Sequence, residues 1–295
     1  MKLEFDFRIV ERIRLWLLIS LAVMVLGGVF AVARGLNFGL DFTGGTMMQI
    51  HLGETVETQE VRDLLAPFEL NEEILSAGSE KDEVIIRTKV SLSNEERKAI
   101  FEALGQRYDL QDEDLIAAEQ FGPSFGADTR NNAVIAILLA GAGMLIYVTL
   151  RFEFVYGAAS IIALLHDVLI LVSIYAIFRI PVNSSFIAAV LTIVGYSIND
   201  TIVVFDRVRE NVKLMKKTTH AKIANESIRQ TLSRTINTSL TTVLVIGSLY
   251  VLGVASIKDF ALPLMLGILV GTYSSIFIAS PIWAKWKDST VGKNE

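Results

Sequence analysis

Six long apolar windows limit the possible folds of this chain more than any other feature of its sequence. About 20 predominantly apolar residues are enough for a helix to cross the hydrocarbon core of a membrane. The windows lie near Leu15–Ala33, Ala133–Leu150, Phe154–Phe178, Val182–Phe205, Ile236–Gly253 and Phe260–Trp283. Hydrophobic residues make up 52% of the whole chain. The sequence therefore predicts a polytopic α-helical membrane protein with six transmembrane helices.

The distribution of Lys and Arg around the windows predicts the orientation of the chain. Basic residues in short flanking segments are retained on the cytoplasmic side. They cluster in both tails and in the loop after the fourth window, at Lys2, Arg8, Arg12, Arg14, Arg207, Arg209, Lys213, Lys216, Lys217, Lys222, Arg229, Arg234, Lys285, Lys287 and Lys293. The loops predicted to lie outside carry only Arg179 and Lys258. We therefore expect both termini in the cytoplasm and the basic loop against anionic lipid head groups.

This orientation divides the chain into six parts. They are a cytoplasmic tail with the first transmembrane helix (1–36), an external α+β domain (37–130), transmembrane helices two to four (131–205), a basic cytoplasmic loop with an amphipathic helix (206–234), transmembrane helices five and six (235–284) and a cytoplasmic tail (285–295).

The first window also has the features of a secretory signal peptide. A basic start and an apolar core precede the small triplet Ala31-Val32-Ala33, which imitates a cleavage site. The apolar core is longer than the roughly 7–15 residues of a typical signal, which favours a retained anchor. The chain has no cysteine, so disulfides and thiolate metal sites are excluded.

The polar segment between the first two windows has its own order of patterns. "TMMQIHL" is typical of a strand, and "TQEVRDLLAPF" predicts a helix with Thr58 as its N-cap and Val61, Leu64 and Leu65 on one face. "EILSAGS" and "DEVIIRTKV" indicate two strands joined by a Gly-containing turn. Ser91–Tyr108 is predicted to form an amphipathic helix with Ile100, Phe101 and Leu104 facing inward, and "LIAAEQFG" indicates a last strand. The order βαββαβ is that of a ferredoxin-like domain.

This external domain is acidic. Between Gly35 and Arg130 there are 20 Asp and Glu residues against 8 Lys and Arg residues, a net charge of −12. Such a surface keeps a domain soluble, or it docks unfolded or basic polypeptide segments; nucleic acid is excluded as an expected partner. The preceding stretch "GLDFTGG" (Gly39–Gly45) lacks the strand and helix of a phosphate-binding loop, so we interpret it as a flexible link.

A carboxylate, Asp200, interrupts the fourth window. A charge inside the membrane costs several kcal/mol on insertion-type scales and normally faces a helix bundle or a wet cavity with a partner. Tyr196 and Ser197 share its helix face, and Asn199 adds a neighbouring polar group. We therefore predict that Asp200 is functional.

Two further polar clusters occur at a similar depth. The third window contains His166 and Asp167, and the fifth begins with Arg234, Asn237, Thr238 and Thr241, of which Asn237 and Thr238 are alternatives for one helical stripe. Arg234 could reach Asp200 and keep it ionised until a proton arrives, and protonation would loosen the pair. Each residue also has a structural alternative: a buried hydrogen-bonding His, an Arg that only fixes topology, and Ser or Thr bonded back to their own helix.

Four motifs together resemble those of a known family. "GLDFTGG" after the first window, "LLHDV" in the third, "GYSINDTIVVFDRVREN" in the fourth and "SRTINTSLTT" at the start of the fifth look like the motifs of the SecD/SecF family, within the RND-like transporter superfamily. The likeness covers essentially the whole chain in order, and the fourth-window motif is long enough to be highly specific.

The resemblance implies a protein-export subunit of the bacterial cytoplasmic (inner) membrane, with residues about 37–130 external. The implied partners are SecD as the other six-span half, the SecYEG channel, YajC, a preprotein substrate and the lipid membrane. In the family, the residues matching Asp200 and Arg234 are implicated in proton movement, whereas His166 and Asp167 match a motif of less defined role. The proton is the implied coupling ion, and no cofactor, metal or enzymatic activity is expected.

Three other functions fit some of these residues. The chain could be half of a proton-coupled exporter of lipids or small molecules, although an external segment of this size leaves little room for a substrate cavity. It could be a non-transducing scaffold of the translocase. Intramembrane hydrolysis by His166 and Asp167 lacks both an HExxH metal pair and a G-x-S-x-G nucleophile context.

Overall fold

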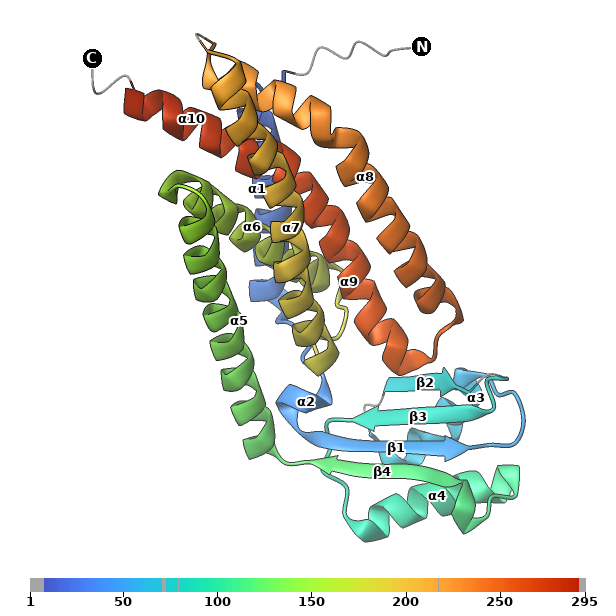
Figure 1. Ribbon diagram of the computed structural model, residues 1–295. Coiled ribbons are helices and arrows are strands. Elements are labelled where there is room, and N and C mark those ends of the chain that lie inside the picture. Colours follow the sequence, from blue (N-terminus) through green and yellow to red (C-terminus); the bar gives the residue numbers. More distant parts are fainter. Residues whose placement is uncertain (1–7, 71–72, 79, 217, 292–295) are drawn as a thin grey trace.

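The computed structural model describes residues 8–70, 73–78, 80–216 and 218–291, and it consists of a helical bundle with a small α+β domain at one end (Figure 1). Six helical segments are long and apolar enough to span a membrane, as predicted. They are α1 (Ile13–Arg34), α5 (Pro123–Arg151), α6 (Phe154–Phe178), α7 (Ser184–Leu214), α8 (His220–Leu252), and α9 (Ala255–Ser274) continued through a π-helical turn (Ser275–Ala279) into α10 (Ser280–Val291). The predicted basic residues Lys2, Lys217 and Lys293 lie outside the described residues.

Helices α6, α7 and α9 form the centre of the bundle, with α7 packed along α9 and α1 packed along α6. Buried aromatic side chains fill this centre, including Trp283, Phe205 and Tyr175. The outward faces of α1 and α5 instead expose leucine and valine side chains, such as Leu18 and Leu138. Exposed apolar surface of this extent suits contact with lipid rather than water.

The segment predicted as a basic loop, 206–234, is largely helical. Helix α7 continues to Leu214 and α8 already begins at His220, where the Thr219 hydroxyl accepts the amide of Lys222 and caps the helix. The polar ends of the two helices therefore extend well beyond their apolar windows.

The α+β domain between α1 and α5 has the predicted βαββαβ order. Its elements are β1 (Gly45–His51), α3 (Thr58–Leu65), β2 (Glu73–Ala77), β3 (Glu83–Thr88), α4 (Asn94–Tyr108) and β4 (Leu115–Phe121). The strands form one antiparallel sheet in the order β2-β3-β1-β4, in which Met48 lies opposite both Ile86 and Ala118. Alternate strand residues and the inward faces of α3 and α4 make its core, with Ile50, Leu65 and Ile100 fully buried.

Both helix starts of this domain differ from the prediction. Helix α3 has Glu57 at its N-cap position and begins at Thr58, so the prediction of Thr58 as the cap is wrong. Helix α4 begins at Asn94 rather than Ser91, because Ser93 and Glu96 form a reciprocal capping box.

The interpretation of "GLDFTGG" as a flexible link is also wrong. Leu40–Thr43 forms a helical turn, α2, whose Phe42 is buried against the bundle. The backbone of Phe42 lies so close to Gly126 of α5 that a β-carbon there would come within 2.6 Å of the Phe42 carbonyl oxygen. Gly44 and Gly45 have positive φ angles of 76° and 136°, so the prediction that glycine permits such angles here is confirmed. The segment is a packed joint between α1 and β1.

Candidate functional site

Two carboxylates are buried inside the helical bundle. Asp167 on α6 is 1% exposed and Asp200 on α7 is 3% exposed. Both therefore occupy the protein interior of the membrane-spanning region, where a charge is retained only when the surrounding side chains supply partners.

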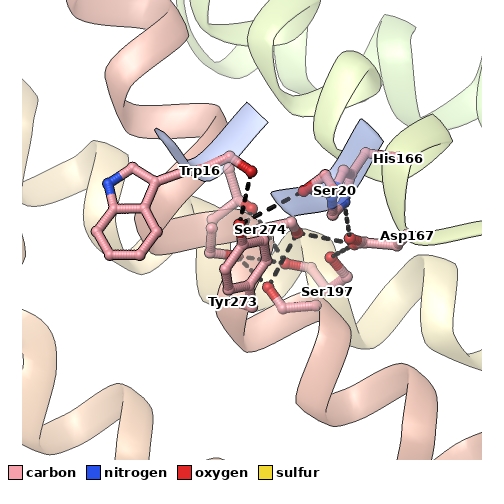
Figure 2. A network of polar contacts seen from close by, with 10 residues as sticks. Trp16, Ser20, His166, Asp167, Ser197, Tyr273 and Ser274 are labelled. Carbon is pink, nitrogen blue, oxygen red and sulfur yellow. Dashed lines mark hydrogen bonds and ion pairs between the residues drawn. The ribbon is translucent and has the colours of Figure 1, made fainter. Parts of the chain in front are cut away.

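Asp167 is held by side chains from three helices (Figure 2). Its Oδ1 lies 3.0 Å from Nδ1 of His166. Its Oδ2 accepts hydrogen bonds from the Ser197 hydroxyl of α7 at 2.6 Å and from the Ser274 hydroxyl of α9 at 2.9 Å. Because hydrogen bonds to an ionised acceptor are short and strong, this arrangement suits a carboxylate that is held in place.

His166 extends this network to α1. Its Nε2 lies 2.8 Å from the Ser20 hydroxyl, and its ring stacks on Tyr273 with 5.8 Å between the ring centroids. The Tyr273 hydroxyl in turn donates to the Trp16 carbonyl at 3.0 Å. Every polar atom of the imidazole thus has a partner, which is the structural alternative predicted for His166.

Asp200 is bonded more sparsely. Among the residues that the structure describes, only the Oδ2 of Asp200 accepts hydrogen bonds, from the Ser239 hydroxyl at 3.2 Å and the Thr272 hydroxyl at 3.4 Å. These two hydroxyls are 2.6 Å apart and also bond each other. One turn before Ser239, the buried Thr235 hydroxyl has no partner within the described part of the chain. The site therefore offers hydroxyl groups that can donate to a carboxylate or accept from a carboxylic acid.

Arg234, the predicted partner of Asp200, lies within electrostatic range of it. Its side chain is nevertheless exposed, and in the part of the chain that the structure covers it forms no ion pair with Asp200. The group that contacts the carboxylate from α8 is Ser239, more than one helical turn further along. The predicted contact between Arg234 and Asp200 is therefore replaced by one between Ser239 and Asp200.

Tyr196 and Ser197, which were predicted to share the helix face of Asp200, contact different helices. The Tyr196 hydroxyl contacts α8, where it donates to the Thr238 carbonyl at 3.2 Å and lies 3.0 Å from the Thr242 hydroxyl. Ser197 contacts Asp167 instead. Neither is bonded to Asp200.

The remaining predicted residues, Asn199, Asn237, Thr238 and Thr241, are exposed in this chain. The hydroxyls of Thr238 and Thr241 donate to the carbonyls of Arg234 and Asn237 on their own helix, which is the structural alternative predicted for them. With Arg234 they give the outer surface of α7 and α8 a polar face inside the membrane-length region.

Sequence analysis missed the side chains that complete both centres. They are Ser20, Ser239, Thr272, Tyr273 and Ser274. For Thr272, Tyr273 and Ser274 the signal was the run "GTYSS" (Gly271–Ser275) inside the sixth apolar window, since polar residues in a membrane helix normally face the bundle.

A third cluster of ionisable groups lies in the α+β domain. One ligand atom from each of His51, Asp82 and Glu83 lies within 4.8 Å of the other two, which is close enough to hold a metal ion. His51 and Asp82 are 3.7 Å apart, and Glu83 accepts a hydrogen bond from Gln49. These half-buried contacts are equally those of an ordinary charged surface.

Comparison with known proteins agrees with the fold and with the motifs. Residues 100–289 match the family described as "Protein export membrane protein SecD/SecF, C-terminal", and residues 29–56 match the "SecD/SecF GG Motif". The second match includes the packed α2 joint.

Relatives match over nearly the whole chain. The SecF subunit of Desulfurispirillum indicum is 37% identical, with 97% of this chain and 94% of the relative covered. SecDF of Thermus thermophilus is 41% identical over 91% of this chain, which spans only 36% of that longer protein.

Two solved structures share the fold. The crystal structure of SecDF, a translocon-associated membrane protein from Thermus thermophilus, superposes with a TM-score of 0.82 and 38% identity, covering 96% of this chain and 39% of that one. SecDF in its super-membrane-facing form gives a TM-score of 0.74 at 36% identity, covering 100% and 40%. The six spanning helices, the ferredoxin-like domain and these matches together place the chain in the SecD/SecF family of protein-export membrane proteins.

Proposed function

We propose that this chain uses the proton-motive force, together with a SecD partner, to promote late steps of preprotein translocation across the bacterial cytoplasmic membrane. The single observation that carries the proposal is Asp200, a buried carboxylate of the bundle that only two shared hydroxyls contact. The names of the relatives, SecF and SecDF protein translocase subunits, supply the export context.

Asp200 is the group that we expect to gain and lose a proton. In its charged form it accepts hydrogen bonds from Ser239 and Thr272. Protonation removes the charge and weakens both hydrogen bonds, because bonds to an ionised acceptor are roughly twice as strong as neutral ones. Protonation therefore weakens the hydrogen bonds that hold α7, α8 and α9 in one arrangement around Asp200.

A SecD partner is proposed for the polar face of α7 and α8. Asn199, Arg234 and Asn237 are exposed there, and polar groups facing lipid inside a membrane are costly. A second six-span half would cover them, which agrees with a relative, SecDF, in which this chain corresponds to 36% of a longer protein. The SecYEG channel and YajC are further proposed partners, with both termini in the cytoplasm and the α+β domain outside.

We propose the proton as the coupling ion and expect neither a cofactor nor an enzymatic reaction. His166 and Asp167 are engaged with Ser20, Ser197 and Ser274, so this pair is structural in the proposal. A non-transducing scaffold is the second candidate, and the complete bonding of the Asp167 centre favours it.

The proposal is tested by the release of a trapped translocation intermediate from vesicles that hold the chain with SecD, with and without a proton gradient. Asp200→Asn should abolish the gradient-dependent part of the release rate. The matched control is Asp206→Asn, which removes a half-exposed carboxylate from the same helix, six residues further along, where Arg151 lies 3.8 Å away.

The control should retain the gradient dependence, and both variants should still assemble with SecD. If Asp200→Asn released the intermediate with full gradient dependence, the carboxylate would be structural and the scaffold function would replace the proposed one.

A further inference from the structure

Two attachments connect the external domain to the outer end of the bundle. The first is a group of three polar side chains, Arg87, Asp259 and Asn183, which we call the outer joint. Arg87 of β3 forms an ion pair with Asp259 of α9, with 3.2 Å between Nη1 and Oδ2. The Asn183 amide donates to the same Asp259 oxygen at 3.3 Å. The two charged side chains are only 19% and 27% exposed, so solvent screens this pair less than an exposed one.

Two of the three helices that meet at Asp200, α7 and α9, also reach the outer joint. Helix α9 carries Asp259 near its start and Thr272 beside Asp200, and Thr272 lies 13 positions after Asp259, which is about 20 Å along the helix. Asn183 accepts the Phe186 amide and so caps α7, the helix that carries Asp200.

Helices α7 and α9 are in close contact between these two points. A β-carbon at Gly267 would come within 2.0 Å of the Ile193 side chain, and one at Gly271 within 2.9 Å of Ser197. Such a seam cannot slide without repacking. The only proline inside α9, Pro263, lies between Asp259 and Gly267, where a helix bends most readily. A change at Asp200 therefore reaches the outer joint along packed helices.

A second attachment lies in the segment that leads from α1 through α2 into β1. Asp41 of α2 accepts the backbone amide of Ser184 at 2.7 Å, and Phe38 forms a backbone bridge with Val182. Between this attachment and the outer joint lies a polar cleft of about 660 Å³, whose lining includes Glu73, Lys89 and Glu119. Figure 1 shows the start of α9 beside the edge of the sheet that carries β2, and α2 beside the start of β1. With α2 as the fixed side, movement of α9 changes the tilt of the domain and the width of the cleft.

We infer that Arg87, Asp259 and Asn183 are positioning residues that transmit the protonation state of Asp200 to the external domain. This inference rests on the proposed function. When Asp200 is protonated, its bond from Thr272 weakens and α9 shifts relative to α7. Because the ion pair joins β3 to the start of α9, β3 moves with α9. The domain then tilts about its attachment at α2.

The experiment uses the full chain with SecD in vesicles and two readouts. One is the distance between spin labels on the external domain and on the outer part of α5, with and without a proton gradient. The other is the gradient-dependent release of a trapped intermediate. The variants are Arg87→Ala, Asp259→Asn, which keeps the side-chain shape, and the reversed pair Arg87→Asp with Asp259→Arg. Lys89→Ala is the matched control, because it removes a cation from the same cleft outside the joint.

We expect each single variant to lower the gradient-dependent release at least fivefold and to abolish the change in label distance. The reversed pair should restore most of both, and Lys89→Ala should change neither. Parental release by Arg87→Ala and Asp259→Asn, or no recovery in the reversed pair, would overturn the inference. Such a result leaves the proposed function intact, because that function fails only if Asp200→Asn keeps its gradient dependence.

Discussion

Asp167 and Asp200 are both buried carboxylates in one bundle, yet their surroundings differ. Asp167 uses both oxygens, with a histidine on one and two serine hydroxyls at 2.6 and 2.9 Å on the other. Asp200 uses one oxygen, and its two hydroxyl partners are 3.2 and 3.4 Å away. The two residues are therefore similarly buried, but they differ in the number and length of the hydrogen bonds that they accept.

The difference lies in what each partner loses when the carboxylate changes. The Ser197 hydroxyl has no acceptor other than Asp167 among the described residues, and His166 would lose its Nδ1 partner. Around Asp200, Thr272 can donate its one hydroxyl proton to the Ile268 carbonyl instead, and Ser239 can then donate to the Thr272 oxygen. A residue that must change charge during a cycle is better placed where its partners remain satisfied in both states.

The largest effect is expected when each carboxylate is replaced by leucine. Asp167→Leu leaves the Ser197 hydroxyl and the His166 ring nitrogen unpaired, which should lower the free energy of unfolding by about 3 kcal/mol. Asp200→Leu leaves no hydrogen-bond donor without a partner and should lower the free energy of unfolding by less than about 1 kcal/mol. Reversible denaturation of the purified chain in mixed micelles measures both values. Equal losses would mean that bonding does not distinguish the two sites.

A second test acts on the helix seam that supports the Asp167 centre. Gly27 and Ser20 are buried on one face of α1, and a β-carbon at Gly27 would come within 2.5 Å of the Ser173 α-carbon of α6, whereas one at Gly28 would meet nothing. Gly27→Ala should push α1 from α6, weaken the bond between Ser20 and His166 and cost about 2 kcal/mol. Gly28→Ala is the matched control and should be neutral or slightly stabilising. The same denaturation assay compares them, and equal stability of the two variants would contradict the close packing of this seam.

Single hydroxyl deletions sharpen the comparison further. Ser197→Ala removes a 2.6 Å bond to Asp167 and should cost about 1 kcal/mol of unfolding free energy, within the range measured for hydrogen bonds between membrane helices. Ser239→Ala removes a 3.2 Å bond that Thr272 can replace, and it should cost less than half as much. It should instead change the gradient dependence of release, because it alters the site of protonation. A greater loss of stability in Ser239→Ala than in Ser197→Ala would reverse the ranking of the two centres.

The sequence was informative where a pattern is local. Six apolar windows predicted six spanning helices, and alternating or helical periodicity predicted the βαββαβ domain. Asp200 and Asp167 could be selected because a carboxylate in an apolar window is rare. The position of α2 depended on Phe42 meeting Gly126, two residues far apart in sequence, and no local pattern contains such a contact.

The partners of the carboxylates were predicted less well for the same reason. Arg234 was chosen by charge, but the rotation of α8 places Ser239 toward Asp200 and leaves Arg234, Asn237 and Thr241 exposed. Helix rotation is set by packing along the whole length of α8 and α9, to which a single sequence gives little access. Serine and threonine are also common in membrane helices as backbone-bonded residues, so Ser274 and Thr272 carried a weak signal.

The smallest effect is expected in the external domain, and it serves as a control for every pH-dependent result on Asp200. Hydrogen bonds from the backbone and the hydroxyl of Ser93 hold the pKa of Glu96 below its ordinary value of 4.5. A carboxyl whose pKa is lowered on folding stabilises the folded state above its unfolded pKa, and this contribution is lost as the pH falls through the folded pKa. The capping box of α4 therefore should not respond near neutral pH. Hydrogen exchange of the α4 amides against pH measures this directly.

Glu96→Gln should remove the acid-range dependence of this exchange, whereas Glu95→Gln, which alters an exposed carboxylate of the same helical turn, should leave it unchanged. Ser93→Ala should speed the hydrogen exchange of the α4 amides at all pH values, since the loss of an N-cap typically costs about 1 kcal/mol of helix stability. If α4 instead changed near neutral pH in the parent and not in Glu96→Gln, the external domain would titrate by itself. A tilt of that domain under a proton gradient would then no longer report on Asp200, and the contrast between the two buried carboxylates would have to be tested inside the bundle alone.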